Sequence, residues 1–199
     1  MTVHALLLRR DMSVAGLLAA AAASSACFGA AVGSYTGRFQ ILYDAVKMPA
    51  YLLGTLAISF AAMHVFAARD LRAGETFGAA VETVALTGVV LGALSPLVWL
   101  FSVSMPVSQQ GYRILILLLT GSVAAAGIAG VARLHSRLRS IRLTAAWVLI
   151  YQFVGAQMGW LLKPWVSHTA RDDRFLPLRQ NLEGNFYEAV LTTIRGLFS

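Results

Sequence analysis

The chain has 199 residues, of which 58% are hydrophobic and 13% are charged, and its formal net charge is +7. Soluble domains carry about 25% charged residues, so this composition excludes an ordinary soluble domain and indicates lipid as the solvent. Nucleic-acid binding is not expected, because the arginines lie at the ends of apolar runs, where they orient a membrane protein.

Five apolar stretches dominate the sequence. They cover residues 13–36, 48–68, 77–105, 113–132 and 144–165. Each has about the 20 residues needed to cross a hydrocarbon core of ~30 Å. The sequence therefore predicts an all-α, polytopic transmembrane helical bundle of five spans in residues 1–166, followed by a tail in residues 167–199.

The first stretch has two interpretations. Arg9 and Arg10 precede it, and an Ala-x-Ala-like cleavage site near Ala23 or Ala26 would suit a signal peptide. The apolar stretch continues through Gly33, however, which is too long for the apolar region of a signal peptide (~7–15 residues). A membrane span is the favoured interpretation.

The segment before the second stretch contains Asp44 and Lys47, three residues apart and ahead of Pro49. On a helix this spacing predicts an ion pair on one face. We expect the pair to be a solvated anchor at the outer surface rather than a ligand site. Pro49 is expected in the first turn of the second span, where its missing N–H costs nothing.

Glu82 lies inside the third stretch, and a carboxylate at that depth is a candidate functional group. The alternative is an interfacial glutamate that reaches cytoplasmic water or pairs with Arg69 or Arg72. His64 lies near the end of the second stretch, and a His64–Glu82 pair would suit proton transfer or metal binding. A structural histidine is the favoured alternative.

Small residues recur at four-residue spacing in four of the stretches, which permits close approach of helices in lipid. They are Gly29, Gly33 and Gly37; Gly88 and Gly92; Gly121, Ala125 and Ala129; and Gly155 and Gly159. Internal packing and self-association both remain open as their role.

Gln152 and Gln157 lie within the fifth stretch, and Lys163 lies at its end. Amides in lipid usually hydrogen-bond to another helix. The alternative is that the two glutamines line an aqueous path.

Arginine placement predicts a cytoplasmic N-terminus. The segments assigned to the cytoplasm contain Arg9, Arg10, Arg69, Arg72, Arg133, Arg137, Arg139 and Arg142, whereas the outer loops contain Arg38, Lys47 and Arg113. The protein is expected in the inner membrane, and an odd number of spans then places its C-terminus in the periplasm. This orientation holds provided that the basic residues of the distant tail are discounted. An interfacial belt is expected from Trp99, Trp160 and Trp165 at the outer boundary and Trp147 at the inner one.

The tail contains one segment with helical periodicity. From an N-cap at Asn185, a helix would place Phe186, Val190 and Ile194 on one side. Such an amphipathic helix would lie on the membrane surface or against the bundle. The candidate docking residues are Trp160, Trp165, Asn185, Phe186 and Tyr187.

Several motifs together resemble a group of bacterial five-span membrane proteins that are loosely called Yip1-like. They are Ala31 to Tyr35, Lys47-Met48-Pro49, Val154 to Trp165, and Glu183 to Tyr187. The resemblance covers residues 30–194 and implies the five-span architecture. It implies no activity.

No zinc-binding pair, nucleophile elbow or phosphate-binding loop is present, so we expect no enzyme, cofactor or metal. The leading hypothesis is a structural or regulatory subunit of a membrane complex, whose partner is a second copy or another membrane protein. The alternative is a small channel or transporter component with a polar path near Glu82, His64, Gln152 and Gln157. An intramembrane enzyme is a third possibility.

Overall fold

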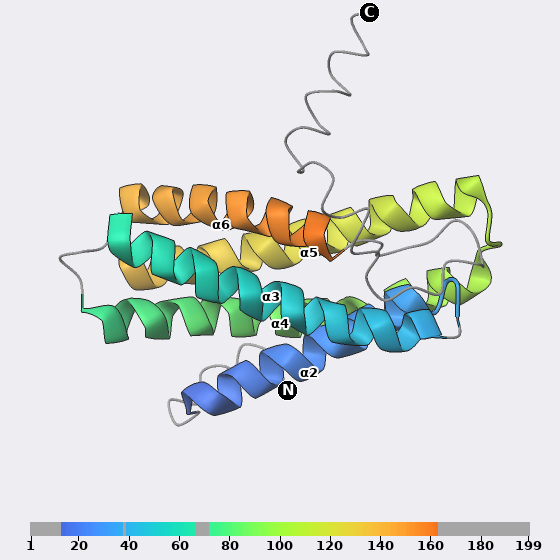
Figure 1. Cartoon of the computed structure of the whole chain (residues 1–199), viewed down its shortest axis with the longest axis horizontal. Helices are drawn as coiled ribbons and strands as arrows, with labels where there is room; N and C mark the ends of the chain where they lie inside the picture. The colour runs from blue at the N-terminus through green and yellow to red at the C-terminus, as the bar shows by residue number, and fades with distance from the viewer. Residues whose placement is uncertain (1–12, 38, 67–71, 163–199) are drawn as a thin grey trace, which may run out of the picture.

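The computed structural model describes residues 13–37, 39–66 and 72–162, which form a bundle of five long α-helices (Figure 1). The helices are α2 (Val14–Gly33), α3 (Phe39–Phe66), α4 (Ala73–Ser104), α5 (Gln109–Leu138) and α6 (Ile141–Leu161). The predicted all-helical fold is confirmed for these ranges. The amphipathic helix predicted after Asn185 lies outside them.

Four of the helices are long and apolar enough to cross a membrane: α2, α3, α4 and α5. The fifth predicted span corresponds to α6. Helix α6 is not among the helices that length and composition identify as able to cross a membrane. The chain therefore has the properties of a helical membrane protein.

Serine side chains fix the start of three helices. Ser13, Ser108 and Ser140 each accept a hydrogen bond from the backbone N–H three residues ahead, at the starts of α2, α5 and α6. Such N-caps satisfy one of the amide groups that have no partner within the helix.

The predicted start of the second span is wrong. Helix α3 begins at Phe39 rather than at residue 48, so Asp44 and Lys47 lie within the helix and Pro49 lies in its interior. The polar residues in 39–47 lower the average hydropathy of this segment, so these turns of α3 were not included in the predicted span. The helix continues through them because the polar side chains are buried among neighbouring helices.

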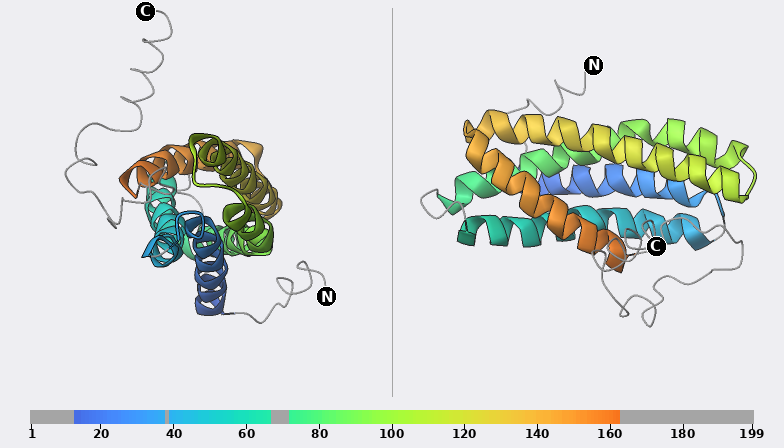
Figure 2. Two further views of the ribbon diagram at one scale, coloured as in Figure 1. Left: turned by 90° about the vertical axis from the view of Figure 1, so that its right-hand side faces the viewer. Right: turned by 90° about the horizontal axis from the view of Figure 1, so that it is seen from above.

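Helix α2 lies at one edge of the bundle, packed closely against α3 and α4 (Figure 2). Gly29 faces the backbone of Asp44 on α3, and a Cβ at Gly88 on α4 would lie 2.9 Å from the Cα of Ala21. These glycines serve internal packing, which was one of the two roles that the sequence left open, the other being self-association.

Two members of the predicted ridges behave differently. Gly37 lies outside the helices with a φ of 70°, so it belongs to the turn after α2. Gly121 is exposed, and a Cβ placed on it would meet no atom within 4 Å, so it does not contribute to packing within the bundle.

A tyrosine joins two connections at the same end of the bundle. The Tyr35 hydroxyl lies 3.0 Å from the Pro106 carbonyl oxygen and 3.1 Å from that of Ser108, and it accepts from the Ser108 N–H. This contact holds the turn after α2 against the connection between α4 and α5.

The remaining helices form a ring in which α3 contacts α4 and α6, and α5 contacts α4 and α6. The contact between α5 and α6 is the loosest of these, although a short turn at Arg139 and Ser140 joins the two helices. The ring therefore has one weakly closed side, and this side determines the geometry of the candidate site.

Candidate functional site

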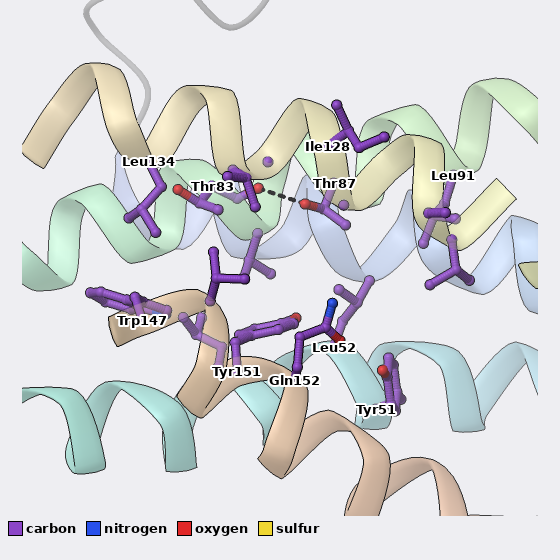
Figure 3. A pocket seen from close by; sticks show the side chains of 18 of the residues that line it. Tyr51, Leu52, Thr83, Thr87, Leu91, Ile128, Leu134, Trp147, Tyr151 and Gln152 are labelled. Carbon is purple, nitrogen blue, oxygen red and sulfur yellow. Dashed lines mark hydrogen bonds between the residues drawn. The ribbon is translucent and has the colours of Figure 1, made fainter. Parts of the chain in front are cut away.

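A cavity of about 500 Å³ lies inside the ring formed by α3, α4, α5 and α6 (Figure 3). Its inner wall includes Leu52, Val84, Leu91, Leu134 and Trp147, all of which are buried. The volume lies within the range of small-molecule sites, which is about 300–1,000 Å³.

The opening of the cavity lies along α5. Thr120, Ala124 and Ile128 follow one another at four-residue spacing, line the cavity and are exposed at its rim; Ile128 is 72% exposed. On the α6 side, the rim contains Gln152, which is also exposed. The cavity therefore opens on an exposed side of the bundle, at α5 and α6.

Small residues on α5 create part of this space. Gly127 lines the cavity, and a Cβ placed on it would meet no atom within 4 Å. Gly130 lies next to α4, where a Cβ would overlap the Thr87 hydroxyl. Neither glycine was among the candidate residues predicted from the sequence, although their three-residue spacing was a signal.

The hydroxyl groups of Thr83 and Thr87, which line the cavity, are bonded within their own helix. Thr83 Oγ1 donates to the Ala79 carbonyl oxygen at 2.8 Å, and Thr87 Oγ1 donates to that of Thr83 at 3.0 Å (Figure 3). Most of the other lining residues are aliphatic or aromatic, with further polar groups from Tyr51, Tyr151 and Gln152. The wall is therefore mainly hydrocarbon, which suits an apolar occupant better than an ion.

Glu82 lies on α4, is not among the residues that line the cavity, and binds two arginines of α5. Its carboxylate is 2.8 Å from the Arg133 guanidinium, and Arg137 Nε donates to it at 2.7 Å, with a second contact from the terminal nitrogen of Arg137. Glu82 was predicted to pair with Arg72, but its partners in the structure are Arg133 and Arg137. Arg69, the other predicted partner, lies outside the described residues.

His64 is held by aromatic rings. Its ring stacks on Phe60 with centroids 6.0 Å apart, and Phe60 packs against Phe77. Within the described part of the chain, no group of three or more metal-binding side chains is found. These contacts favour the structural interpretation of His64 over a His64–Glu82 relay.

Asp44 and Lys47 are fully buried, which overturns the expectation of a solvated anchor. Gln40 Nε2 donates to Asp44 Oδ1 at 2.9 Å, and Asp44 interacts electrostatically with Lys47. The close approach of α2, made possible by Gly29, covers this segment of α3 and excludes solvent from it.

The other candidates are distributed between the bundle and the undescribed tail. Gln152 lies at the cavity rim, whereas Gln157 lies further along α6 and is partly buried. Trp147 is buried in the cavity wall rather than facing an interface, so its predicted place in the aromatic belt is wrong. Trp160 lies in the last turn of α6. Lys163, Trp165, Asn185, Phe186 and Tyr187 lie outside the described residues.

The fold and this cavity define the class as a helical membrane protein with an internal, laterally open apolar pocket. A scan against protein-family models, a search of curated proteins and a search of solved structures each found no match. The resemblance to Yip1-like five-span proteins therefore stays a prediction.

Proposed function

We propose that this chain is a non-enzymatic, five-span protein of the bacterial inner membrane that binds the apolar chain of a membrane lipid in its cavity. In this role it would be a lipid-responsive regulatory subunit of a membrane complex. The observation that supports the proposal best is the cavity of about 500 Å³ whose rim follows the exposed stripe of α5.

The proposal treats α6 as the fifth span. Its 21 residues have a helical length of about 32 Å at 1.5 Å per residue, which matches the hydrocarbon core. With α6 crossing, the basic end of the bundle that carries Arg133 and Arg137 faces the cytoplasm, and the C-terminus lies in the periplasm.

A lipid chain suits this cavity better than an ion path does. The hydroxyls of Thr83 and Thr87 are already bonded to backbone carbonyls, and the remaining lining is mostly aliphatic and aromatic. A lipid chain also reaches the cavity through the weakly closed side between α5 and α6 without crossing water.

The experiment uses Trp147 as a reporter, because it lines the cavity and is only 3% exposed. In a protein with Trp99, Trp160 and Trp165 replaced by Phe, reconstituted in nanodiscs, phospholipids with brominated acyl chains should quench Trp147 fluorescence. Lipid in the surrounding bilayer does not contact a buried indole, so quenching requires a chain inside the cavity.

The matched variants are Gly127→Leu and Gly121→Leu in that background. Both glycines lie on α5 with open space around a Cβ, but only Gly127 lines the cavity. Gly127→Leu should remove most of the quenching, and Gly121→Leu should preserve it. Trp147 that is unquenched in the parent, or quenched equally in the Gly127→Leu variant, would refute the proposal.

A further inference from the structure

One part of the cavity wall carries a cluster of hydrogen-bonding groups, from Tyr151 and Gln152 of α6 and Tyr51 of α3. A Cβ placed on Gly155 would lie 3.0 Å from the Tyr51 hydroxyl oxygen, and Gly155 follows Tyr151 by one helical turn. The two phenols are close enough to interact electrostatically. In Figure 3 the Tyr151 hydroxyl points toward Gln152 and away from Trp147. These polar groups therefore gather in one region of a cavity that is otherwise mainly hydrocarbon.

The polar groups of the wall are all neutral. None of the described residues that line the cavity is charged. The phosphate of a phospholipid or the carboxylate of a fatty acid would find no counterion there, and a buried charge without a partner is costly. Each phenol instead offers one O–H donor, and the Gln152 amide offers two N–H donors. The wall therefore suits an uncharged ligand with oxygen atoms that accept hydrogen bonds.

The cluster also lies near the middle of the bundle. Ile141 and Leu161, the two ends of α6, lie 11 and nine residues from Gln152, which is about 14–17 Å at 1.5 Å per residue. With α6 crossing a hydrocarbon core of ~30 Å, this position lies close to the middle of the bilayer, whereas the polar groups of phospholipids lie at its edges. A lipid that satisfies the cluster must carry an uncharged polar group that enters the hydrocarbon region.

Aromatic rings line the same cavity. The indole of Trp147 and the rings of Tyr51 and Tyr151 all contribute to its wall. Aromatic side chains pack favourably against another planar ring in offset or edge-to-face arrangements. The volume of about 500 Å³ is in the range of small-molecule sites, so it accommodates a ring together with part of an apolar chain.

We infer that the lipid in the cavity is uncharged and has a carbonyl-bearing ring, of the chemical class of the isoprenoid quinones. Its carbonyl oxygens accept hydrogen bonds from the Tyr151 hydroxyl and the Gln152 amide, and its apolar chain lies along the aliphatic lining. This inference rests on the proposed function, because it names the class of lipid that the cavity takes.

The experiment compares two quenchers in the protein that retains only Trp147, in phosphatidylcholine nanodiscs. One is a benzoquinone with a decyl chain, and the other is a bromobenzene with the same chain, which has a similar ring but no carbonyl groups. The mole fraction that gives half-maximal quenching reports occupancy of the cavity rather than the strength of each quencher. We expect this mole fraction to be about two- to tenfold lower for the quinone, which is the range for one hydrogen bond.

Two glutamines of α6 provide a matched pair of variants. Gln152 lines the cavity, whereas Gln157 is not among the lining residues. Gln152→Leu should remove most of the preference for the quinone, and Gln157→Leu should preserve it. Tyr151→Phe, which keeps the ring and removes the hydroxyl, should reduce the preference as well. Unchanged quenching by the bromobenzene in these variants shows that the cavity is intact, a result that unfolding would not give.

The results separate the two proposals. Equal mole fractions for the two ring compounds, with quenching by the brominated phospholipid retained, would overturn the inference and leave the proposed function standing. A preference that survives both Gln152→Leu and Tyr151→Phe, or that falls equally in Gln152→Leu and Gln157→Leu, would also overturn the inference. Trp147 that none of the three compounds quenches would reject the proposed function itself.

Discussion

At the scale of single residues, the glycines of α2 have the clearest physical role. A Cβ on Gly29 would overlap the backbone carbonyl of Asp44, and backbone atoms are unable to move aside as a flexible side chain does. By contrast, Gly78 in α4 has open space around a Cβ position. The two positions should therefore respond to the same substitution in opposite directions.

We predict that Gly29→Ala destabilises the bundle by about 1–3 kcal/mol or more, because α2 and α3 must separate. Gly78→Ala should be neutral or stabilising by up to ~1 kcal/mol, because alanine has the higher helix propensity. Circular dichroism during SDS-induced unfolding measures both. Equal effects at the two positions would show that close contact between α2 and α3 is not present in solution.

The sequence identified Glu82 as unusual but did not identify the residues with which it pairs. Its depth in an apolar stretch correctly marked it as unusual, but proximity in sequence suggested Arg69 or Arg72 as its partners. The observed partners, Arg133 and Arg137, come from α5. Which helix packs beside α4 depends on side-chain fit across the whole bundle, and hydropathy carries no information on that fit.

At the scale of the elements, four predicted spans agree with observed helices, and the largest error lies at the start of α3. Asp44 and Lys47 were assigned to a surface segment because charged residues in lipid are costly. The structure instead buries both inside the protein, where Gln40 donates to Asp44. Burial by a neighbouring helix is a tertiary property that no window of sequence contains.

We predict that Asp44→Leu destabilises the protein by about 3–5 kcal/mol, because it leaves the Lys47 charge buried without the neighbouring carboxylate. Adding Lys47→Met should recover part of this loss, since the double variant removes both charges. Thermal unfolding in detergent of the two single variants and the double variant completes a double-mutant cycle, which measures the interaction energy between Asp44 and Lys47. Strictly additive losses would contradict an interaction between Asp44 and Lys47.

The cavity was not predictable from any single element. It depends on residues from four helices and on the loose contact between α5 and α6. The sequence carried partial signals, including Gln152 inside an apolar stretch and small residues along α5. These signals became a site only when the helix order around the ring was known.

At the scale of the whole molecule, the bundle combines a tightly packed half with a loosely closed half. Helix α2 is held against α3 and α4 by close glycine contacts and α5 packs against α4, whereas the contact between α5 and α6 is the loosest in the ring. The proposed regulatory role depends on this division.

The most direct measurement is a cryo-electron microscopy structure of the protein in nanodiscs that contain phosphatidylglycerol. We predict elongated density inside the ring that enters between Ile128 and Gln152. Helices α5 and α6 packed tightly together, with side chains filling the space between Trp147 and Leu91, would contradict a lipid-binding cavity.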